Sequence, residues 1–570
     1  MSGKRRTFRL TFAATALLLL AGSFLLTRFT GDLSGARADL TSERLYTMSP
    51  SAKTILGDLK VPVQVKLYVT GEDQMPTELK TLERDVTDKL RDYASASDGM
   101  IQFSVHDPQD DEEMQDALTQ RGIRPFQVQS IDKDEIGVKL IWSAMTIAYK
   151  DKPEEVIPQV LPQSLANLEY ELVSRVYRLT RDRQPVVALV APKQEVDQQT
   201  AMMYLQQGMQ PPEPVDVYTG VAQILQQEHY TVRRVKLTAN FRIPEDADAL
   251  VVLNPHGLDA RQAFEINRAL SNGLNTLLAV QLHAYDYQPG PRGDFIVSGA
   301  SQTTGLEDML AGLGVTVDTR HLCDESNQML SVPRTQNVGG LRFQTNEPVR
   351  KPIQIWVNES TINQDAPMTG RIANLLYLWG TALETDGDVL ASHGLEQEVL
   401  FTASDRAWRV PFQDGMVPGS AFNASGKSME PGLPLAVRLS GEFPDTFNAT
   451  GAPAWAAAPG AEAPDPADDR IAPLAPAAAQ LVVVGCAKMF DDMALQAGQN
   501  PLLLINAVDN MVHGDDLVSI RSKILTQRVI RPVSDREKLA FRIFVTALVP
   551  CLIAAYGLFR AAARRKEVTR

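Results

Sequence analysis

The stretch "DALVVLNPHGLDARQAFEINRALSNGLNTLLAVQL", residues 248–282, decides the fold of the central part of the chain. Its first ten residues predict a buried strand that ends in a Pro/Gly turn. Residues 260–273 predict a helix, and residues 275–282 predict a second buried strand. A strand, a helix and a strand in this order indicate a right-handed crossover between parallel strands.

The same alternation continues on both sides of this stretch. Residues 185–192 (PVVALVAP) predict a buried strand by their length and β-branched content, and a helix over 217–229 and a strand over 231–237 follow. Residues 480–485 (QLVVVG) predict one more buried strand that returns to the same sheet, before a helix over 500–514. We therefore expect a mostly parallel α/β domain, Rossmann-like or amidotransferase-like in class.

A separate α/β domain is expected before this sheet. Ser49 is a typical N-cap with Pro50 at the first helical position, and residues 61–69 alternate as a half-buried strand does. A helix with one apolar face follows, and Asp107-Pro108 is expected to open another, before three further strands. This β-α-β-α-β-β order is similar to a thioredoxin-like domain, but the redox cysteines are missing, so we expect no thiol chemistry.

Both ends of the chain are predicted to lie in a membrane. Eighteen uncharged residues separate Arg9 from Arg28, and seventeen separate Arg542 from Arg560. At ~1.5 Å of rise per residue, each run just spans a ~30 Å hydrocarbon layer. Basic residues flank the two runs on their outer sides, and positive charge stays on the cytoplasmic side. These topology signals are Lys4, Arg5, Arg6, Arg564, Arg565 and Lys566.

We therefore predict a two-pass protein of a bacterial inner membrane with both termini cytoplasmic and the bulk of the chain extracytoplasmic. Two other interpretations of the N-terminus stay open: residues 4–10 form a loose twin-arginine signal, and "ARA" at 36–38 resembles a signal-peptidase site. The apolar run ends about ten residues before that site, which favours an uncleaved anchor.

The predicted domain organisation follows from these elements. It comprises 1–30 (cytoplasmic tip and transmembrane helix), 31–180 (thioredoxin-like order), 181–330 (second α/β domain), 331–448 (β-rich continuation), 449–479 (Ala/Pro-rich flexible linker or surface loop), 480–536 (return strand and helix) and 537–570 (transmembrane helix and basic tail).

Several functions are disfavoured by the sequence. A net charge of −13 argues against nucleic-acid binding, which needs a basic face. The segment "AFNASGKS", residues 421–428, ends like a phosphate-binding loop, but Ala421 replaces the first glycine and no buried strand precedes it. No nucleophile elbow and no metal-ligand spacing occur, and Cys486 lacks small neighbours. We predict no catalytic residue, cofactor or metal. Cys323 and Cys486 can pair only in an oxidising compartment, and parity alone suggests that pair.

One candidate ligand site remains. The turn Asn254, Pro255, His256 and Gly257 lies at the carboxyl end of a predicted strand, where open α/β sheets bind ligands. A simple turn histidine is the alternative interpretation of His256.

Five segments in order resemble the GldG-like family of ABC-transporter auxiliary proteins. They are 39–49 (DLTSERLYTMS), 248–281, 305–324, 437–447 and 481–523, and they keep their order over nearly the whole length of the chain. The family entry motif is carried by Asp39, Leu40, Thr41, Tyr46 and Ser49. The resemblance implies a non-enzymatic membrane-anchored subunit whose partners are an ABC-2-type permease and a cytosolic ABC ATPase, with an outer head that contacts cargo or envelope partners.

Two departures from the family pattern put details in doubt. The acidic turn after the last strand is replaced by Gly485, Cys486, Ala487 and Lys488, and the usual Gly-Gly is Asn272-Gly273. Two other functions remain to be weighed: a stand-alone extracytoplasmic ligand-binding or sensor module, and, less favoured, an amidotransferase-like hydrolase that uses Cys486.

Overall fold

The computed structural model describes part of the 570-residue chain. Its described residues are 48–132, 135–165, 167–181, 183–193, 198–289, 295–338, 341–456, 469, 471–515, 520 and 542. The chain divides into two compact units, Met1–Ile524 and Leu525–Arg570. Within the described residues no helix has the length and apolar character needed to cross a bilayer. Both predicted transmembrane helices, all six topology signals and the motif residues Asp39, Leu40, Thr41 and Tyr46 lie outside the described residues.

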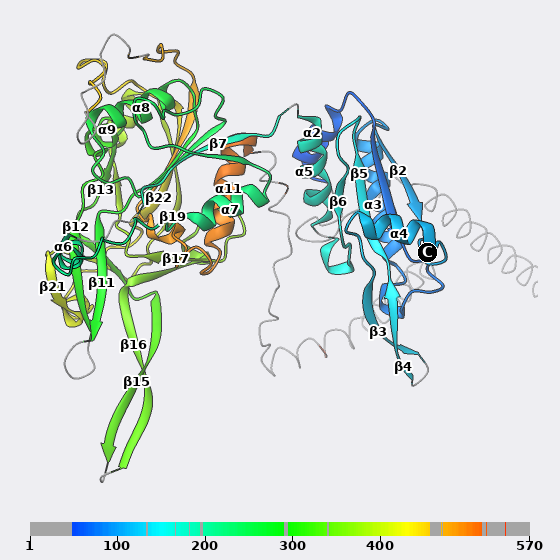
Figure 1. Cartoon of the computed structure of the whole chain (residues 1–570), viewed down its shortest axis with the longest axis horizontal. Coiled ribbons are helices and arrows are strands. Elements are labelled where there is room, and N and C mark those ends of the chain that lie inside the picture. Colours follow the sequence, from blue (N-terminus) through cyan, green and yellow to red (C-terminus); the bar gives the residue numbers. More distant parts are fainter. Residues whose placement is uncertain are drawn as a thin grey trace, which may run out of the picture. The chain divides into compact units, whose positions relative to one another are not determined.

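A four-stranded sheet organises the first part of the described chain (Figure 1). Its order is β2 (Ile101–His106), β1 (Val63–Val69), β5 (Ser143–Ala148) and β6 (Glu155–Ile157). β1 is parallel to β2, whereas β1–β5 and β5–β6 are antiparallel pairs. The sheet is therefore mixed.

Helices cover this sheet because β1 alternates between two apolar cores. Val63, Val65, Leu67 and Val69 share one core with α2 (Pro50–Gly57), α3 (Leu82–Ala96) and α5 (Leu168–Thr180), whereas Tyr68 shares another with α4 (Glu112–Gln120). Ser49 caps α2 and Pro50 is its first residue, as the sequence predicts.

Two details of this part differ from the sequence-based expectation. α4 is capped by the side chain of Asp111 and begins at Glu112, four residues after the predicted Asp107-Pro108 start, because the Asp111 carboxylate accepts the backbone N–H of Met114 at 2.9 Å. β3 (Phe126–Asp132) and β4 (Glu135–Ile141) pair only with each other, as a hairpin outside the main sheet.

A seven-stranded sheet organises the second part. Its order is β19 (Glu396–Thr402), β22 (Pro434–Glu442), β23 (Ala478–Val484), β10 (Thr276–Ala279), β9 (Ala249–Leu253), β7 (Val186–Val190) and β8 (Thr231–Arg234). The five strands from β23 to β8 are parallel, and β22 and β19 extend the sheet antiparallel at the β23 edge. The sheet is thus mostly parallel, with an antiparallel edge that the sequence did not indicate.

The central parallel strands β7, β9 and β10 are buried along their whole length, which explains their largely apolar sequences. Val251 and Leu253 of β9 pack with α7 (Thr219–Gln227) and α11 (Asn500–His513) on one face. Leu250 and Val252 pack with α8 (Ala260–Ser271) and α9 (Glu307–Gly312) on the other. Figure 1 shows α7 beside α11, and α8 beside α9, on opposite sides.

Smaller sheets and hairpins surround this sheet. β15 and β16 form a long hairpin that projects from the sheet region (Figure 1), and only the last residues of β16 pair with β17. The remaining elements are α6 (Gln198–Gln206), β11 (His283–Pro289), β12 (Phe295–Ser301), β13 (Val315–Val317), β14 (His321–Asp324), β15 (Asn327–Val338), β16 (Leu341–Asn358), β17 (Asn374–Leu378), β18 (Leu383–Thr385), α10 (Gly387–Ser392), β20 (Ala407–Val410) and β21 (Gly415–Pro418), with short 3-10 turns at Thr77–Leu79, Pro162–Ser164, Glu359–Thr361, Gly419–Phe422 and Lys488–Phe490.

The described residues of the Ala/Pro-rich segment pack against α8. The Asp469 carboxylate pairs with Arg242 at 2.6 Å and with Arg261 at 2.5 Å. The Arg261 side chain is 1% exposed and lies over the Trp455 ring, 4.8 Å from its centroid. Of the two predicted forms of this segment, these residues therefore take that of a packed surface loop.

Two further sequence features have a plain structural outcome. Cys323 and Cys486 are both buried and free, so they do not pair.

The "AFNASGKS" segment runs from the 3-10 turn Gly419–Phe422 through a second turn, and no helix begins between it and β22. A phosphate-binding loop needs a following helix N-terminus, and this segment lacks one.

Candidate functional site

The carboxyl ends of four parallel strands converge on a cavity of about 840 Å³, here called the carboxyl-end cavity. Lys193 follows β7, Asn254 follows β9, Gln281 follows β10 and Lys488 follows β23. Parallel strands bring their carboxyl ends to one edge of the sheet, so these four residues meet there although they are far apart in sequence. The rest of the lining comes from neighbouring loops and β11: Pro192, Val215, Val217, Tyr218, His256, His283, Ala284, Tyr285, Gln302, Trp379 and Asp491.

Asn254 is the most unusual residue of this cavity. Its backbone lies in the left-handed region at φ +47°, and its N–H donates to the carbonyl of Ala279 at 2.9 Å. The Tyr218 phenol lines the same cavity, and burial raises its pKa. The Oδ1 of Asn254 is buried and has no hydrogen-bond partner among the described residues. A buried acceptor without a donor is costly, so this atom is suited to accept a hydrogen bond from a ligand.

The other residues of the predicted crevice occupy the same turn. His256 is exposed and lines the cavity, with Nδ1 3.3 Å from the Asn254 carbonyl. Pro255 is buried, and Gly257 adopts φ +62°; neither lines the cavity. Ligand binding by this turn stays a prediction.

One wall of the cavity is held by a polar network around Gln281. Its side-chain amide donates to the Trp379 carbonyl at 2.6 Å, and its oxygen accepts the Lys488 N–H at 3.2 Å. The Lys488 ammonium pairs with Asp491 at 2.5 Å and lies 5.6 Å from the Trp379 ring centroid. Lys488 stands in the turn that is acidic in the resembled family, so this chain places a cation at that position.

His283 lines both this cavity and a second one of about 550 Å³, and its ring lies beside that of the buried His321. The His283 ring stacks on Phe412 with centroids 4.0 Å apart and lies 5.6 Å from His321. His283 Nε2 is 3.0 Å from the Thr319 carbonyl, and His321 Nδ1 is 2.7 Å from the Tyr285 hydroxyl. His283 Nδ1 and His321 Nε2 have no partner among the described residues.

Burial decides the charge of this pair. It is the main cause that lowers the pKa of each histidine to about 4, and repulsion from a protonated His283 contributes to the lowered pKa of His321. Both rings are therefore neutral at neutral pH. Neutral rings serve as hydrogen-bonding groups, and the described residues hold no group of three or more His, Cys, Asp or Glu side chains suited to a metal ion.

The candidate nucleophile Cys486 lies behind this cavity. Its side chain is 0% exposed, its thiol donates to the Leu378 carbonyl at 3.2 Å, and burial raises its pKa to about 12. Reactive cysteines are accessible and partly ionised. The thiol of Cys486 is therefore a structural group.

Ser49 is the one residue of the predicted entry motif that the structure describes. Its hydroxyl and its N–H both donate to Glu169 of α5, at 2.5 and 2.8 Å, and the side chain is 4% exposed. These contacts tie the start of α2 to α5. This motif position is structural.

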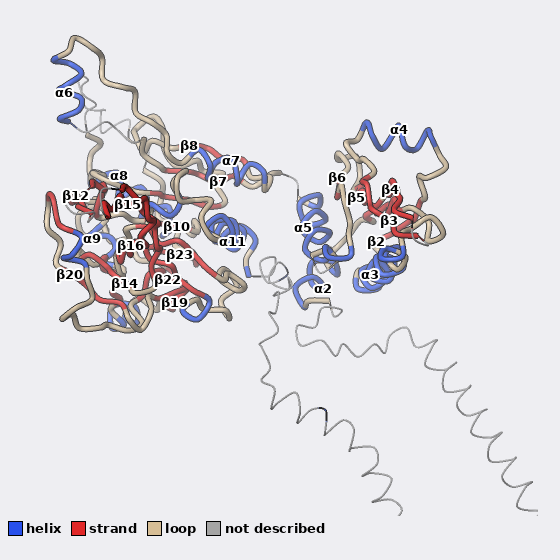
Figure 2. The backbone as a smooth tube through the Cα atoms, turned by 90° about the horizontal axis from the view of Figure 1, so that it is seen from below, coloured by secondary structure: helices blue, strands red, loops and turns tan. Residues whose placement is uncertain are grey.

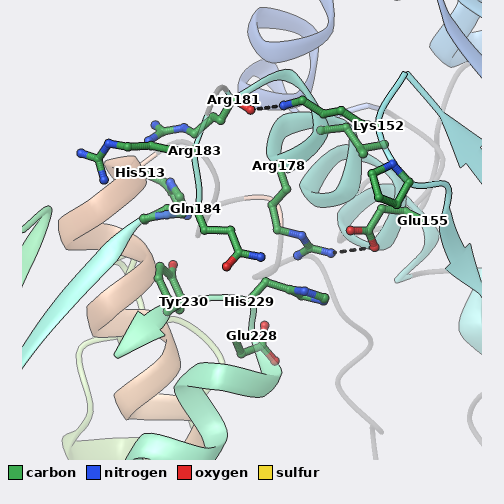
Figure 3. A pocket seen from close by; sticks show the side chains of 13 residues that line it. Lys152, Glu155, Arg178, Arg181, Arg183, Gln184, Glu228, His229, Tyr230 and His513 are labelled. Carbon is green, nitrogen blue, oxygen red and sulfur yellow. Dashed lines mark hydrogen bonds and ion pairs between the residues drawn. The ribbon is translucent and has the colours of Figure 1, made fainter. Parts of the chain in front are cut away.

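A cavity of about 330 Å³ lies at the amino ends of β7 and β8 and is called the amino-end cavity (Figure 3). Its lining carries the basic residues Lys152, Arg178, Arg181 and Arg183 and the acidic residues Glu155 and Glu228. Arg178 and Glu155 form an ion pair at 3.8 Å, which is long, and the Arg178 Nε is buried without a hydrogen-bond partner among the described residues. Figure 3 shows Arg178, Gln184 and His229 around the central space.

Sequence reasoning missed most of the carboxyl-end cavity. Asn254 was predicted as a site residue because it follows a strand. Lys193, Gln281 and Lys488 also follow strands, so the same argument could have predicted them. His283 and His321 gave no such signal, because they meet only through the packing of β11 against β14.

Comparisons with known proteins point to one family. Residues 184–511 match the model of a family described as "ABC-type uncharacterized transport system", an auxiliary-component family, and this match spans more than half of the chain. Residues 42–148 match a "Domain of unknown function (DUF7088)". No curated protein matches the chain significantly.

Two solved structures show a weak likeness. The first, "mmIFT52 N-terminal domain", is 12% identical, with 58% of this chain and 98% of that chain covered, at a TM-score of 0.30. The second, a putative ThuA-like protein from Bacteroides uniformis, is 10% identical, with 58% and 94% covered, at a TM-score of 0.28. Scores of this size assign neither a fold nor a function.

Proposed function

The chain belongs to the family of ABC-type transport system auxiliary components, and from this membership we propose that it is a non-enzymatic, membrane-anchored subunit of an ABC-2-type system. In this proposal both ends cross the inner membrane and both termini are cytoplasmic. The described α/β part stands outside, beside a multispanning permease, and a separate cytosolic ATPase supplies the energy. The head contacts cargo or envelope partners.

The observation that carries the proposal is the family match over residues 184–511. Several features of the site support a non-enzymatic role. Cys486 is buried with a pKa raised to about 12, and the "AFNASGKS" turn leads into no helix. The charge distribution of the two end segments supports the anchoring. GldG-like function in gliding is not part of the proposal.

Affinity purification tests this function. We expect the full chain, tagged at its C-terminus and extracted from membranes in a mild detergent, to recover a permease and an ATPase of the ABC-2 type. A matched purification of a variant without residues 1–30 and 537–570 controls for capture by the outer part alone. Recovery of the full chain as a monomer without either protein contradicts the proposal.

A second candidate function is supported by the carboxyl-end cavity. A stand-alone sensor or binding module needs an accessible site with unsatisfied polar groups, and the buried Oδ1 of Asn254 in a cavity of about 840 Å³ meets that need. Ligand-dependent stabilisation of the purified chain without partners, lost in Asn254→Leu and kept in the exposed control Asn423→Leu, supports this function. Screening that finds no stabilising compound leaves the transport subunit as the better account.

A further inference from the structure

The amino-end cavity collects positive charge in an acidic chain. Four of its lining residues are basic and two are acidic, whereas the whole chain carries a net charge of −13. Arg183 is neutralised, because its two terminal nitrogens donate to the Asp248 carboxylate at 2.7 and 2.8 Å. Lys152, Arg178 and Arg181 form no hydrogen-bonded ion pair with any residue that the structure describes. Three positive charges of the cavity therefore lack a bonded counter-charge.

Arg178 is the least satisfied of these basic groups. Its one charge partner among the described residues is Glu155 at 3.8 Å, which is too long for a hydrogen bond, and its buried Nε has no hydrogen-bond partner there. Arg175, one helical turn earlier on α5, shows the usual outcome, because its Nη1 pairs with Glu171. The Arg178 side chain is only 20% exposed, so water covers little of it. A mostly buried guanidinium without an acceptor is costly, and an acceptor from a ligand would stabilise it.

The other groups around the central space are also hydrogen-bond donors. Lys152 donates to the backbone carbonyl of Arg181, and the Arg181 guanidinium donates to a tyrosine hydroxyl. The Gln184 oxygen accepts from a threonine hydroxyl at 3.4 Å, which leaves its amide nitrogen as a donor. Figure 3 shows Gln184 and His229 beside Arg178 around the same space. The cavity therefore presents donors from several directions.

This excess of donors and positive charge selects an anionic ligand with several acceptor oxygens. Guanidinium groups bind carboxylates and phosphates through paired N–H donors. A carboxylate is planar, whereas a phosphate presents its oxygens in a tetrahedral arrangement, so donors on several sides of the space favour a phosphate. At about 330 Å³ the cavity lies at the small end of the range for ligand sites, about 300–1,000 Å³. This size suits a single phosphate group.

We propose that the amino-end cavity binds a phosphate group, carried by a free phosphate compound or by the head group of an anionic lipid. Arg178 is the main ligand-binding residue, and Glu155 opposes binding because its carboxylate repels the anion. The lining comes from α5, from the start of β7 and from the turn between α7 and β8. Figure 2 shows β7, β8 and α7 side by side. A bound phosphate therefore links α5 to the edge of the seven-stranded sheet.

Thermal unfolding of the full chain measures this binding. The chain is placed in phosphatidylcholine nanodiscs in a phosphate-free buffer, and inorganic phosphate is added up to about 10 mM, with sodium chloride of equal ionic strength as the reference. A ligand that binds only the folded state raises the melting temperature as its concentration rises. We expect inorganic phosphate to raise the melting temperature and chloride to leave it unchanged.

Two variants of the same cavity are expected to change phosphate binding in opposite directions. Arg178→Gln removes the charge and the paired donors, and it should weaken binding more than about tenfold. Glu155→Gln removes the acid next to Arg178, and it should strengthen binding about threefold. Arg84→Gln alters an arginine of α3 that is 70% exposed, and as the matched control it should bind phosphate normally. If Arg178→Gln does not fold, Glu155→Gln decides alone, and unchanged or weaker binding in that variant overturns the proposal.

A second set of nanodiscs, which contains phosphatidylglycerol, separates the two sources of the phosphate group. Stabilisation by inorganic phosphate in phosphatidylcholine nanodiscs, lost in Arg178→Gln, supports a free phosphate ligand. Stabilisation by phosphatidylglycerol alone, lost in the same variant, supports a lipid head group. Absence of both effects, or stabilisation that Arg178→Gln retains in full, overturns the proposal.

Discussion

The two ends of the same parallel strands carry cavities of different construction. The carboxyl-end cavity is lined by residues that follow four strands, and its walls are fixed by buried groups such as Gln281 and the His283–His321 pair. The amino-end cavity is lined by long charged side chains, and its ion pair between Arg178 and Glu155 is long, at 3.8 Å, and partly exposed. A site fixed by buried packing is held in one geometry, whereas a site made of surface ion pairs is held weakly.

The largest expected effect is the loss of stability in acid, which arises from the histidine pair next to the carboxyl-end cavity. The folded-state pKa of His283 and of His321 is about 4, below the unfolded value near 6.5, so the unfolded state binds more protons between these values. The stability that both neutral rings contribute is present above pH ~6.5 and is lost as the pH falls toward 4. The loss is about 3 kcal/mol per histidine over this window.

Unfolding midpoints in urea from pH 7.5 to 4 measure this loss. In His283→Gln the amide can still donate to the Thr319 carbonyl, and the slope between pH 6.5 and 4 should fall by about half. An unchanged slope in that variant would show that the acid sensitivity arises elsewhere.

A methyl group at Gly485, the residue that follows β23, tests the packing next to the carboxyl-end cavity. A Cβ there would lie against the Thr381 carbonyl oxygen and 2.6 Å from the Tyr377 hydroxyl, and the Thr381 atom belongs to the backbone. We expect Gly485→Ala to lower the free energy of unfolding by about 3 kcal/mol. Gly387→Ala, where nothing lies within 4 Å, is the matched control and should be close to neutral. Equal melting temperatures of the two variants would mean that the surroundings of Gly485 are not tightly packed.

The smallest effect is expected at the amino-end cavity. Glu155 lies 3.8 Å from Arg178 and 3.9 Å from Arg175, and partly exposed pairs of this length contribute little. Glu155→Gln should change the free energy of unfolding by less than about 1 kcal/mol, and the change should shrink in 0.5 M salt. A loss of unfolding free energy as large as that expected for Gly485→Ala would show that the amino-end cavity is also held rigidly, and the two cavities would then not differ in construction.

The difference between the cavities also explains what the sequence could predict. β7, β9, β10 and β23 are mostly apolar runs bounded by turns, so the sequence pattern predicts both the strands and the edge of the sheet at which they end. The positions of Asn254 and His256 at this edge could be predicted too, because their turn directly follows a strand. The antiparallel edge formed by β22 and β19 was not predicted, since it arises from pairing between distant segments.

Features that depend on tertiary packing were missed or only partly predicted. The composition of residues 449–479 favoured a flexible linker or surface loop, yet Trp455 and Asp469 anchor part of that segment on Arg261. The start of α4 was placed too early because Asp107-Pro108 and Asp111 both resemble helix starts, and the Asp111 cap prevailed. Family membership, by contrast, was predicted from ordered segments and is confirmed at the level of the ABC-type transport system.

The central claim is that the α/β part works outside the cytoplasm between two membrane anchors, and cysteine labelling tests it most directly. Cys323 and Cys486 are buried, so they give little background in the folded chain. Asp388→Cys places a thiol at an exposed position of α10, and Ser2→Cys places one at the predicted cytoplasmic terminus. In intact spheroplasts, a membrane-impermeant maleimide is expected to label position 388 and to leave position 2 unlabelled until the membrane is opened. Labelling of position 388 only after lysis would contradict the topology and the proposed subunit role together.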